Sequence, residues 1–218
     1  MTWFRTWNGA VVLLLIGCVV SGGCGDWGSG NRSANESAAI TTLHYITVAQ
    51  EEFRAAGEVD QDGDGKGEYG LLGEIVGMQK MRGSGDLAKR VYLSEKWWDE
   101  LEGGTVRSKG YLFKVYLPAG EGEGLEEEEG KVPAGVGSEA VDLQEAYYVC
   151  YAWPERLGET GTRAFAAIEV APFWATKMEG RGYEGFEWVP DTGAMYKGEA
   201  FVSEPGGSDG NTWSVPTY

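Results

Sequence analysis

SANESAAITTLHYITVAQEEFRAAG, residues 33–57, has the pattern of one amphipathic helix. Ser33 and Glu36 match a capping box, in which each side chain satisfies a free backbone amide of the first turn. Apolar residues then recur every three to four positions, which places them on one helical face. They are Ile40, Leu43, Ile46, Ala49 and Phe53. Gly57 ends the run, so we predict a helix of about six turns whose apolar face must be covered by another element.

Three apolar stretches downstream predict the sheet that covers this face. YLFKVYL at 111–117 opens after Gly110 and ends at Pro118, AYYVCYAW spans 146–153, and RAFAAIEV spans 163–170. The second stretch is apolar on both alternating faces, which is typical of a central strand with a helix on one side and a second layer on the other. The pattern therefore predicts an α+β fold, with one long N-terminal helix packed on an antiparallel sheet of three to five strands.

The remaining segments carry weaker signals. We predict a helix over 86–93, and Ser94 can cap a further turn that runs to Leu101. Residues 119–139 are rich in glycine and contain four consecutive glutamates, so we expect a mobile acidic loop there. Short strands are also expected at 186–189 and 195–201.

The N-terminus has the pattern of an export signal. Arg5 precedes AVVLLLIGCVV at 10–20, an apolar run that is too short for a comfortable membrane span. Cys18 follows LIG, which resembles a lipobox, whereas Cys24 follows SGG and leaves an apolar run of more ordinary length. We favour a signal peptide over 1–23 with lipidation at Cys24, and we keep Cys18 as the other candidate. An uncleaved anchor and plain secretion remain alternatives.

The rest of the chain divides into a tether and one domain. Residues 24–33 are rich in glycine and serine, which predicts a flexible tether. Residues 34–218 are long enough for a single domain with a substantial core. Cys150 lies in an apolar stretch with at most Cys24 as a partner, so we expect a buried thiol and exclude a disulfide framework.

The charge of the chain restricts its partners. The 218 residues include 34 acidic and 18 basic side chains, a net charge of −16. Removal of Arg5 with the signal peptide leaves 17 basic against 34 acidic residues, a net charge of −17. Such a field repels nucleic acid and anionic lipid headgroups, and it attracts divalent cations and basic surfaces.

The stretch DQDGDGKGEY at 60–69 suggests a calcium site. Asp60, Asp62 and Asp64 occupy alternate positions and a glycine follows the third, which is how a short loop wraps oxygen ligands around Ca²⁺. The pattern is incomplete, because the twelfth position, which needs a bidentate glutamate, is Leu71. Glu68 is the candidate substitute, so the predicted ligands are the three aspartates and Glu68. The alternative is a solvated acidic turn, where Asp and Gly are common.

Catalytic signals are few. His44 is the single histidine and lies on the predicted helix, where a surface histidine is the ordinary interpretation. A Gly-x-Ser-x-Gly nucleophile elbow is absent, so we expect no enzyme. Aromatic residues of the tail either form a platform for sugar or protein, or fill the core, and we favour the core. They are Trp174, Tyr183, Phe186, Trp188, Tyr196 and Trp213.

Several phrases together resemble a known family. They are the helix from Asn35 to Gln50, the Asp-rich stretch from Asp60 to Gly70, Gly110 to Val115, Cys150 to Pro154, and Gly158 to Phe165. In this order they resemble the soluble domains of bacterial type IV pilin-like and type II secretion pseudopilin-like proteins, within an uncharacterised subset of envelope proteins. The resemblance covers roughly residues 34–170, and it implies a pilin-like head in the cell envelope.

One departure from this family changes the expected function. Pilin-like proteins assemble through one unbroken helix whose apolar half starts just after a processing site. Here glycines between 22 and 30 separate the apolar run from the helix, and each costs about 1 kcal/mol inside a helix. We therefore expect a lipid-anchored bacterial envelope protein that faces the periplasm or the cell exterior. The domain would serve a structural or binding role, as a monomer or small oligomer rather than a filament.

The partners expected are a membrane, through the lipid anchor, and a protein or polysaccharide of the envelope. Two other functions remain open at this stage. One is a ligand-binding lipoprotein that uses the aromatic tail, and the other is an enzyme of unrecognised type. Exposed aromatic rings on one face would favour the first, and a pocket with His44 beside carboxylates would favour the second.

Overall fold

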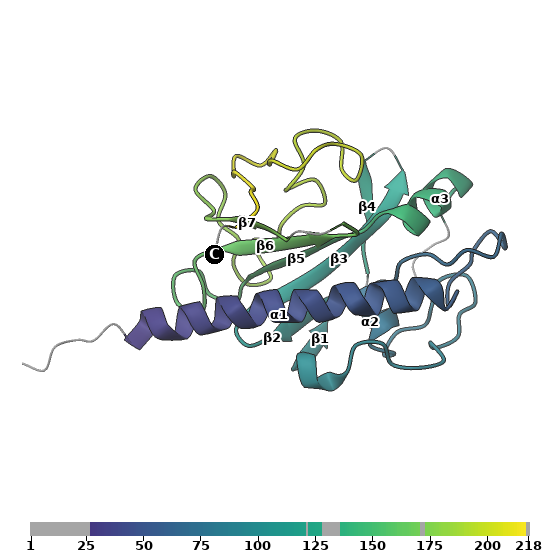
Figure 1. The fold of residues 1–218 in the computed structure, drawn as a ribbon, viewed down its shortest axis with the longest axis horizontal. Coiled ribbons are helices and arrows are strands. Elements are labelled where there is room, and N and C mark those ends of the chain that lie inside the picture. The colour runs from purple at the N-terminus through teal and green to yellow at the C-terminus, as the bar shows by residue number, and fades with distance from the viewer. Residues whose placement is uncertain (1–26, 121, 128–135, 171–172, 217–218) are drawn as a thin grey trace, which may run out of the picture.

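The computed structural model describes residues 27–120, 122–127, 136–170 and 173–216, with side chains from residue 31 onward. A long helix, α1 (Trp27–Ala55), crosses one face of an antiparallel sheet, and the C-terminal tail covers the opposite face (Figure 1). The predicted α+β fold, with a long N-terminal helix packed on an antiparallel sheet, is therefore confirmed.

The sheet is larger than expected. Its seven strands follow the order β1-β2-β3-β5-β6-β7, and β4 pairs with β3 outside this path. The strands are β1 (Glu100–Glu102), β2 (Thr105–Ser108), β3 (Tyr111–Gly120), β4 (Glu123–Leu125), β5 (Val149–Pro154), β6 (Ala164–Ile168) and β7 (Trp174–Thr176). All of these pairs are antiparallel, and the three predicted strands form the centre of the sheet as β3, β5 and β6.

The two faces of β5 belong to two separate cores, as its double apolar pattern predicts. Cys150 and Ala152 point into the core beneath α1, together with Phe113 of β3. Tyr151 and Trp153 point the other way, into a second core that the tail completes. This arrangement explains why a strand with no polar face is stable, since both of its faces are removed from water.

The predicted apolar stripe of α1 covers the sheet. Leu43, Ile46, Ala49 and Phe53 are buried and Ile40 is partly buried against them. Gln50 is also buried, and its side-chain amide donates to Gly70 O at 2.7 Å and accepts from Gly70 N at 2.8 Å. A buried polar side chain is stable only when it is hydrogen-bonded, so this pairing fixes the segment after α1 onto the helix.

The helix begins earlier than predicted, which corrects the start at Ser33. It is already helical at Trp27 and passes through Gly28 and Gly30, so most of the predicted 24–33 tether is helix. Extending an existing helix adds one hydrogen bond per residue without a new nucleus, and this offsets the glycine cost. Residues 24–26 of the tether and the predicted signal peptide, 1–23, lie outside the described residues.

The first described side chains of α1 anchor it to the turn before β6. Arg32 Nη1 donates to Gly158 O at 2.7 Å, and Asn35 Nδ2 donates to Thr160 O at 3.0 Å. Glu36 forms a 2.8 Å ion pair with Arg163. These bonds hold the helix to the sheet from Arg32 onward. The predicted capping box of Ser33 and Glu36 does not mark the start of the helix, which begins at Trp27.

Several local predictions are wrong. Residues 86–93 form bends and irregular chain rather than a helix, and Ser94 caps only the short 3-10 helix η1 (Glu95–Trp97). The strand expected to end at Pro118 continues to Gly120, because at Pro118 β3 has left β5 and pairs with β4 across a bulge. A proline is tolerated there since it lies at an irregularity rather than inside a regular ladder.

The segment predicted as a mobile acidic loop, 119–139, contains ordered structure in its described part. It includes β4 and the buried Glu127, and it leads into α3 (Ser138–Ala146), while α2 (Leu72–Ile75) follows the aspartate loop. Self-repulsion of the acidic run was expected to keep it solvated. That repulsion is offset where Glu126 pairs with Lys114 at 2.6 Å.

The tail folds without the two predicted strands. Residues 186–189 and 195–201 form turns with isolated bridges, and β7 is the sheet strand of this region. At 195–201, packing of Tyr196 and Phe201 on the second core replaces strand pairing. Among the described helices, none is both long and apolar enough to cross a membrane.

Candidate metal site and the polar network behind it

The aspartate loop follows α1 and is shaped by its own side chains. Asp60 Oδ1 accepts from Gly63 N at 2.8 Å, and Asp60 Oδ2 accepts from Gly65 N at 3.2 Å. Asp62 Oδ1 accepts from Asp64 N at 3.1 Å. Gly63 and Gly65 have φ of 76° and 87°, a conformation that favours glycine. Alternating Asp and Gly therefore fold the chain into a tight turn with its carboxylates on one side.

The three predicted aspartate ligands come together. One carboxylate oxygen from each of Asp60, Asp62 and Asp64 lies within 4.8 Å of the others. Calcium binds oxygen at about 2.3–2.6 Å, so two oxygens on opposite sides of one ion are separated by roughly 5 Å. The spacing matches a shared cation, and all three carboxylates are exposed, which gives an ion direct access.

Helix α3 brings a second set of carboxylates to the same loop. Asp62, Asp142 and Glu145 form another group whose oxygens lie within 4.8 Å of one another. Glu145 Oε1 is buried and has no hydrogen-bond partner among the described residues. Sequence analysis missed Asp142 and Glu145 because α3 was not predicted, although their spacing of three residues is a helical signal.

Lys66 supplies a positive charge at the same place. Its Nζ lies 2.6 Å from Asp64 Oδ2 and 3.2 Å from Glu145 Oε2, so it links the loop to α3. The lysine holds the pKa of Asp64 below its ordinary value through hydrogen bonding to the carboxylate. Lys66 thus neutralises part of the negative charge of the carboxylates, and a bound cation would neutralise more of it.

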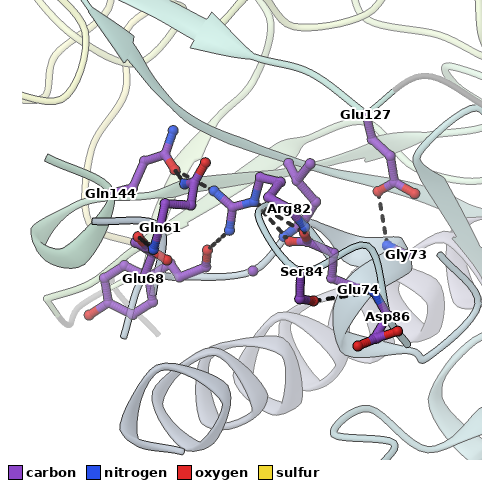
Figure 2. A network of polar contacts seen from close by, with 12 residues as sticks. Gln61, Glu68, Gly73, Glu74, Arg82, Ser84, Asp86, Glu127 and Gln144 are labelled. Carbon is purple, nitrogen blue, oxygen red and sulfur yellow. Dashed lines mark hydrogen bonds and ion pairs between the residues drawn. The ribbon is translucent and has the colours of Figure 1, made fainter. Parts of the chain in front are cut away.

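The fourth predicted ligand, Glu68, is not part of the aspartate cluster. Its side chain is fully buried, and Oε1 accepts from Gln61 N at 2.8 Å (Figure 2). Burial raises the pKa of its carboxyl group above the ordinary value. The assignment of Glu68 as a ligand is corrected on this ground, because the carboxylate is turned inward and braces the loop from behind.

Behind the loop, Arg82 is the centre of a buried polar network (Figure 2). Its Nε donates to both carboxylate oxygens of Glu74, at 3.1 and 3.2 Å, and its other nitrogens donate to Gln144 Oε1 and Tyr69 O. Glu74 also accepts from Leu71 N at 2.8 Å. The guanidinium therefore joins the aspartate segment, α2 and α3, and a buried charge held by this many partners is satisfied.

Glu127 connects the acidic segment to the same network. Its Oε2 accepts from Gly73 N of α2 at 2.9 Å (Figure 2). The side chain fits because two glycines make room: a Cβ at Gly73 would lie 2.1 Å from Oε1, and a Cβ at Gly104 would lie 2.5 Å from the Glu127 Cβ. Burial raises the pKa of Glu127 to about 7, and the nearby Glu74 carboxylate adds to this shift.

A hollow of about 520 Å³ adjoins the aspartate loop. Asp62 lines it together with Gln61, Gly83, Val136, Ser138 and Val141. The loop and α3 therefore form two walls of one depression. Asp62, which belongs to both groups of carboxylates, lines this depression.

The other chemically notable residues have structural surroundings. His44 is exposed on α1, with its ring edge-on to Tyr45. Cys150 is a free, fully buried thiol, and burial raises its pKa. The expectations of a surface histidine and a buried thiol are confirmed.

Most of the aromatic tail fills the second core, as favoured from the sequence. Tyr183, Tyr196 and Trp213 are buried, and Trp174 is partly buried against them. Phe186 and Trp188 are exposed instead. The six rings therefore do not form one shared platform.

The lipidation candidates Cys18 and Cys24 lie outside the described residues. Comparison with known proteins adds no assignment: no protein-family model, curated protein or solved structure matches the chain.

Proposed function

We propose that the chain is a lipid-anchored protein of the bacterial cell envelope, with a pilin-like domain in a structural or binding role and no catalytic activity. The observation that carries this proposal is the course of α1, whose N-terminal end runs past the sheet (Figure 1). The apolar run at 10–20 and both candidate cysteines precede this end in the sequence. An anchor at either cysteine would therefore present the domain away from the membrane surface.

The helix is suited to carry load between an anchor and the domain. Arg32, Asn35 and Glu36 bind the turn before β6, and the apolar stripe further along is buried against the sheet. A pull on the N-terminus is thereby distributed over side-chain hydrogen bonds, an ion pair and the main core. This supports a structural role for the element that joins the domain to its anchor.

A second part of the proposal is that the aspartate loop binds Ca²⁺ through Asp60, Asp62 and Asp64. The matching oxygen spacing supports it, and so does the buried, unpartnered Glu145 Oε1 beside Asp62. The ion would join the loop to α3, next to the contact that Lys66 already makes. Calcium would then stabilise the domain rather than perform chemistry.

Membrane fractionation of the full-length chain tests the anchor. A multiply acylated cysteine holds a protein firmly, because each buried CH₂ contributes about 0.8 kcal/mol. We expect Cys18→Ala plus Cys24→Ala to release the protein from membranes and to abolish incorporation of a labelled fatty acid. Ser29→Ala, which lies beyond both candidate cysteines in the sequence, serves as the control. A double variant that stays membrane-bound, with a wild type that takes up no label, would show that the lipoprotein assignment is wrong.

A ligand-binding lipoprotein is the second candidate, and one observation favours it. Two aromatic side chains of the tail, Phe186 and Trp188, are exposed although their neighbours fill a core. Their surroundings indicate what kind of ligand they would bind.

A further inference from the structure

The exposed rings belong to one short turn, residues 184–188, which we call the aromatic turn. Phe186 is 44% exposed and Trp188 is 57% exposed. Transfer of large aromatic side chains out of water is favourable, so an indole left more than half exposed is not accounted for by packing of the domain. Leu157, from a neighbouring turn, is 38% exposed and adds to this small apolar area.

The aromatic turn is rigid. Glu184 N donates to Trp188 O at 3.0 Å, and Trp188 N donates to Glu184 O at 3.2 Å, so both ends of the turn are paired. The buried Trp153 of β5 supports it from beneath, because its Nε1 donates to Gly185 O at 2.8 Å. The exposed rings are therefore presented on a fixed backbone, which lowers the entropy cost of binding.

A cavity of about 300 Å³ lies beside the exposed indole. Trp188, Leu157, Gly182, Arg181 and Glu184 line it. Leu157 N donates to Glu184 Oε1 at 3.1 Å, which orients this carboxylate. Arg181 is oriented as well, because its Nη1 pairs with Asp191 at 2.5 Å. The cavity thus combines one flat apolar wall with a hydrogen-bond acceptor and a donor whose positions are set.

These features fit a sugar ring better than a protein surface. A pyranose presents flat C–H faces that pack on an indole, while its hydroxyl groups bind carboxylate and guanidinium groups at the edge. A stable protein interface needs about 800 Å² on each partner, far more than three exposed apolar side chains provide. An anionic ligand is disfavoured, since the chain carries −16 and Asp191 already neutralises Arg181. The hydroxyl groups of a neutral sugar can bind the carboxylate and the guanidinium alike.

We propose that the aromatic turn and Leu157 bind a neutral polysaccharide, with a sugar ring stacked on Trp188 and its hydroxyls bound by Glu184 and Arg181. This inference rests on the proposed function, since it names a ligand for an anchored binding domain. It requires neither calcium nor a particular lipidation site, so it can fail while the anchor proposal stands.

Depletion binding to insoluble cellulose and chitin tests the proposal, with the full-length chain in a neutral detergent. Trp188→Ala should weaken binding about tenfold, because loss of a stacked aromatic contact of about 1.4 kcal/mol corresponds to that factor. Phe186→Ala should change it little, because Phe186 does not line the cavity and the Arg107 guanidinium lies over its ring, 5.6 Å from the centroid. Tyr45→Ala is the matched control, since Tyr45 is an exposed aromatic residue on α1, and it should bind as the wild type does.

Any of three results would overturn the proposal: a wild type that binds neither polymer, a Trp188→Ala variant that binds as tightly as wild type, or a preference of the chain for anionic polygalacturonate. Equal retention on phenyl-agarose and on cellulose would also count against it, because that pattern indicates an apolar contact without sugar recognition. Membrane fractionation of Trp188→Ala should match wild type in every case, which separates this test from the test of the anchor.

Discussion

At the scale of single residues, Glu127 has the clearest consequence for stability. It is buried against Gly73 and Gly104, and the ionisable groups that act on it are Glu74, Lys114 and Arg82. Its pKa of about 7 exceeds the ordinary value of 4.5. A carboxyl group whose pKa is raised on folding contributes stability that is complete below pH 4.5 and is lost as the pH rises through about 7.

We therefore predict that Glu127→Gln stabilises the protein at high pH. Glutamine keeps an oxygen for Gly73 N and carries no charge, so the variant avoids a penalty of about 3 kcal/mol above pH 8. Urea unfolding from pH 4.5 to 8.5 measures this, and the advantage of the variant should grow with pH. Glu123→Gln, which removes an exposed carboxylate on β4, should show no such trend. Parallel pH profiles for Glu127→Gln and wild type would contradict the prediction.

The site residues show which part of the site was readable in sequence. Asp60, Asp62 and Asp64 converge because they are two positions apart in one turn, and a local pattern captures that. Glu68 is only four residues beyond, yet it is buried against Gln61 and is not with the aspartates. Its place depends on the long-range contact of the loop with Arg82 and Gln144, and no spacing within the loop encodes that contact.

At the scale of elements, α1 should lose stability when its buried stripe is truncated. Leu43→Ala removes a fully buried side chain from the main core, and we expect a cost of about 2–5 kcal/mol from lost burial and a residual cavity. Val48→Ala, on the exposed face of the same helix, should change the free energy of unfolding by less than about 0.5 kcal/mol. Equal costs for the two variants in chemical denaturation would show that the stripe does not pack on the sheet.

The aspartate loop, as an element, should respond to metal. Three carboxylates this close repel one another, and calcium at about a hundred times its dissociation constant adds about 2.7 kcal/mol. For a domain of this size, that free energy corresponds to a rise of roughly 5–10 °C in Tm. Thermal melts with calcium and with chelator measure the difference. Asp62→Asn should abolish the rise in Tm. Glu204→Gln, an exposed charge change in the tail, should retain it. Identical melts of the wild type in both buffers would show that the loop is an acidic turn that binds no calcium.

The elements that were predicted correctly each have a strong local pattern of apolar residues. The stripe of α1 repeats every three to four residues, and β5 is apolar on both faces, so these were predicted with their partners. The hairpin β1–β2 and the helix α3 were missed because their apolar signal is weak: β1 and β2 are three and four residues long, and α3 alternates charged or polar residues with few apolar ones. Of the two strands expected in the tail, 195–201 forms turns that bury Tyr196 and Phe201 in the second core. Residues 186–189 instead belong to the turn whose Phe186 and Trp188 are exposed.

At the scale of the whole molecule, the question is whether the domain assembles into filaments. The glycines before Ser33 were expected to separate the helix from the anchor. Gly28 and Gly30 are helical in α1, so these two do not separate them. The remaining reasons are structural. The apolar stripe of α1 is buried against its own sheet. On the outer face, one side of the Tyr45 ring stacks on Trp97 with 3.6 Å between ring centroids, and Tyr45 stays 37% exposed.

Charge acts in the same direction. Copies that each carry −16 repel one another when they pack closely, although salt at physiological strength shortens the range of this repulsion to about 8 Å. The described part of α1 buries its apolar stripe against its own sheet, and this repulsion opposes close packing of copies. We accordingly expect a monomer or small oligomer.

The assembly state of the native, full-length chain tests most directly whether the domain forms filaments. Sedimentation velocity in neutral detergent should show a single species of monomer or small-oligomer mass, and electron microscopy of the membranes that carry it should show no fibres. Raising the salt concentration should leave that species unchanged, because no buried apolar surface on α1 becomes available. Regular fibres on those membranes, or a mass that grows with protein concentration, would contradict the account and would indicate a pilin role for the domain.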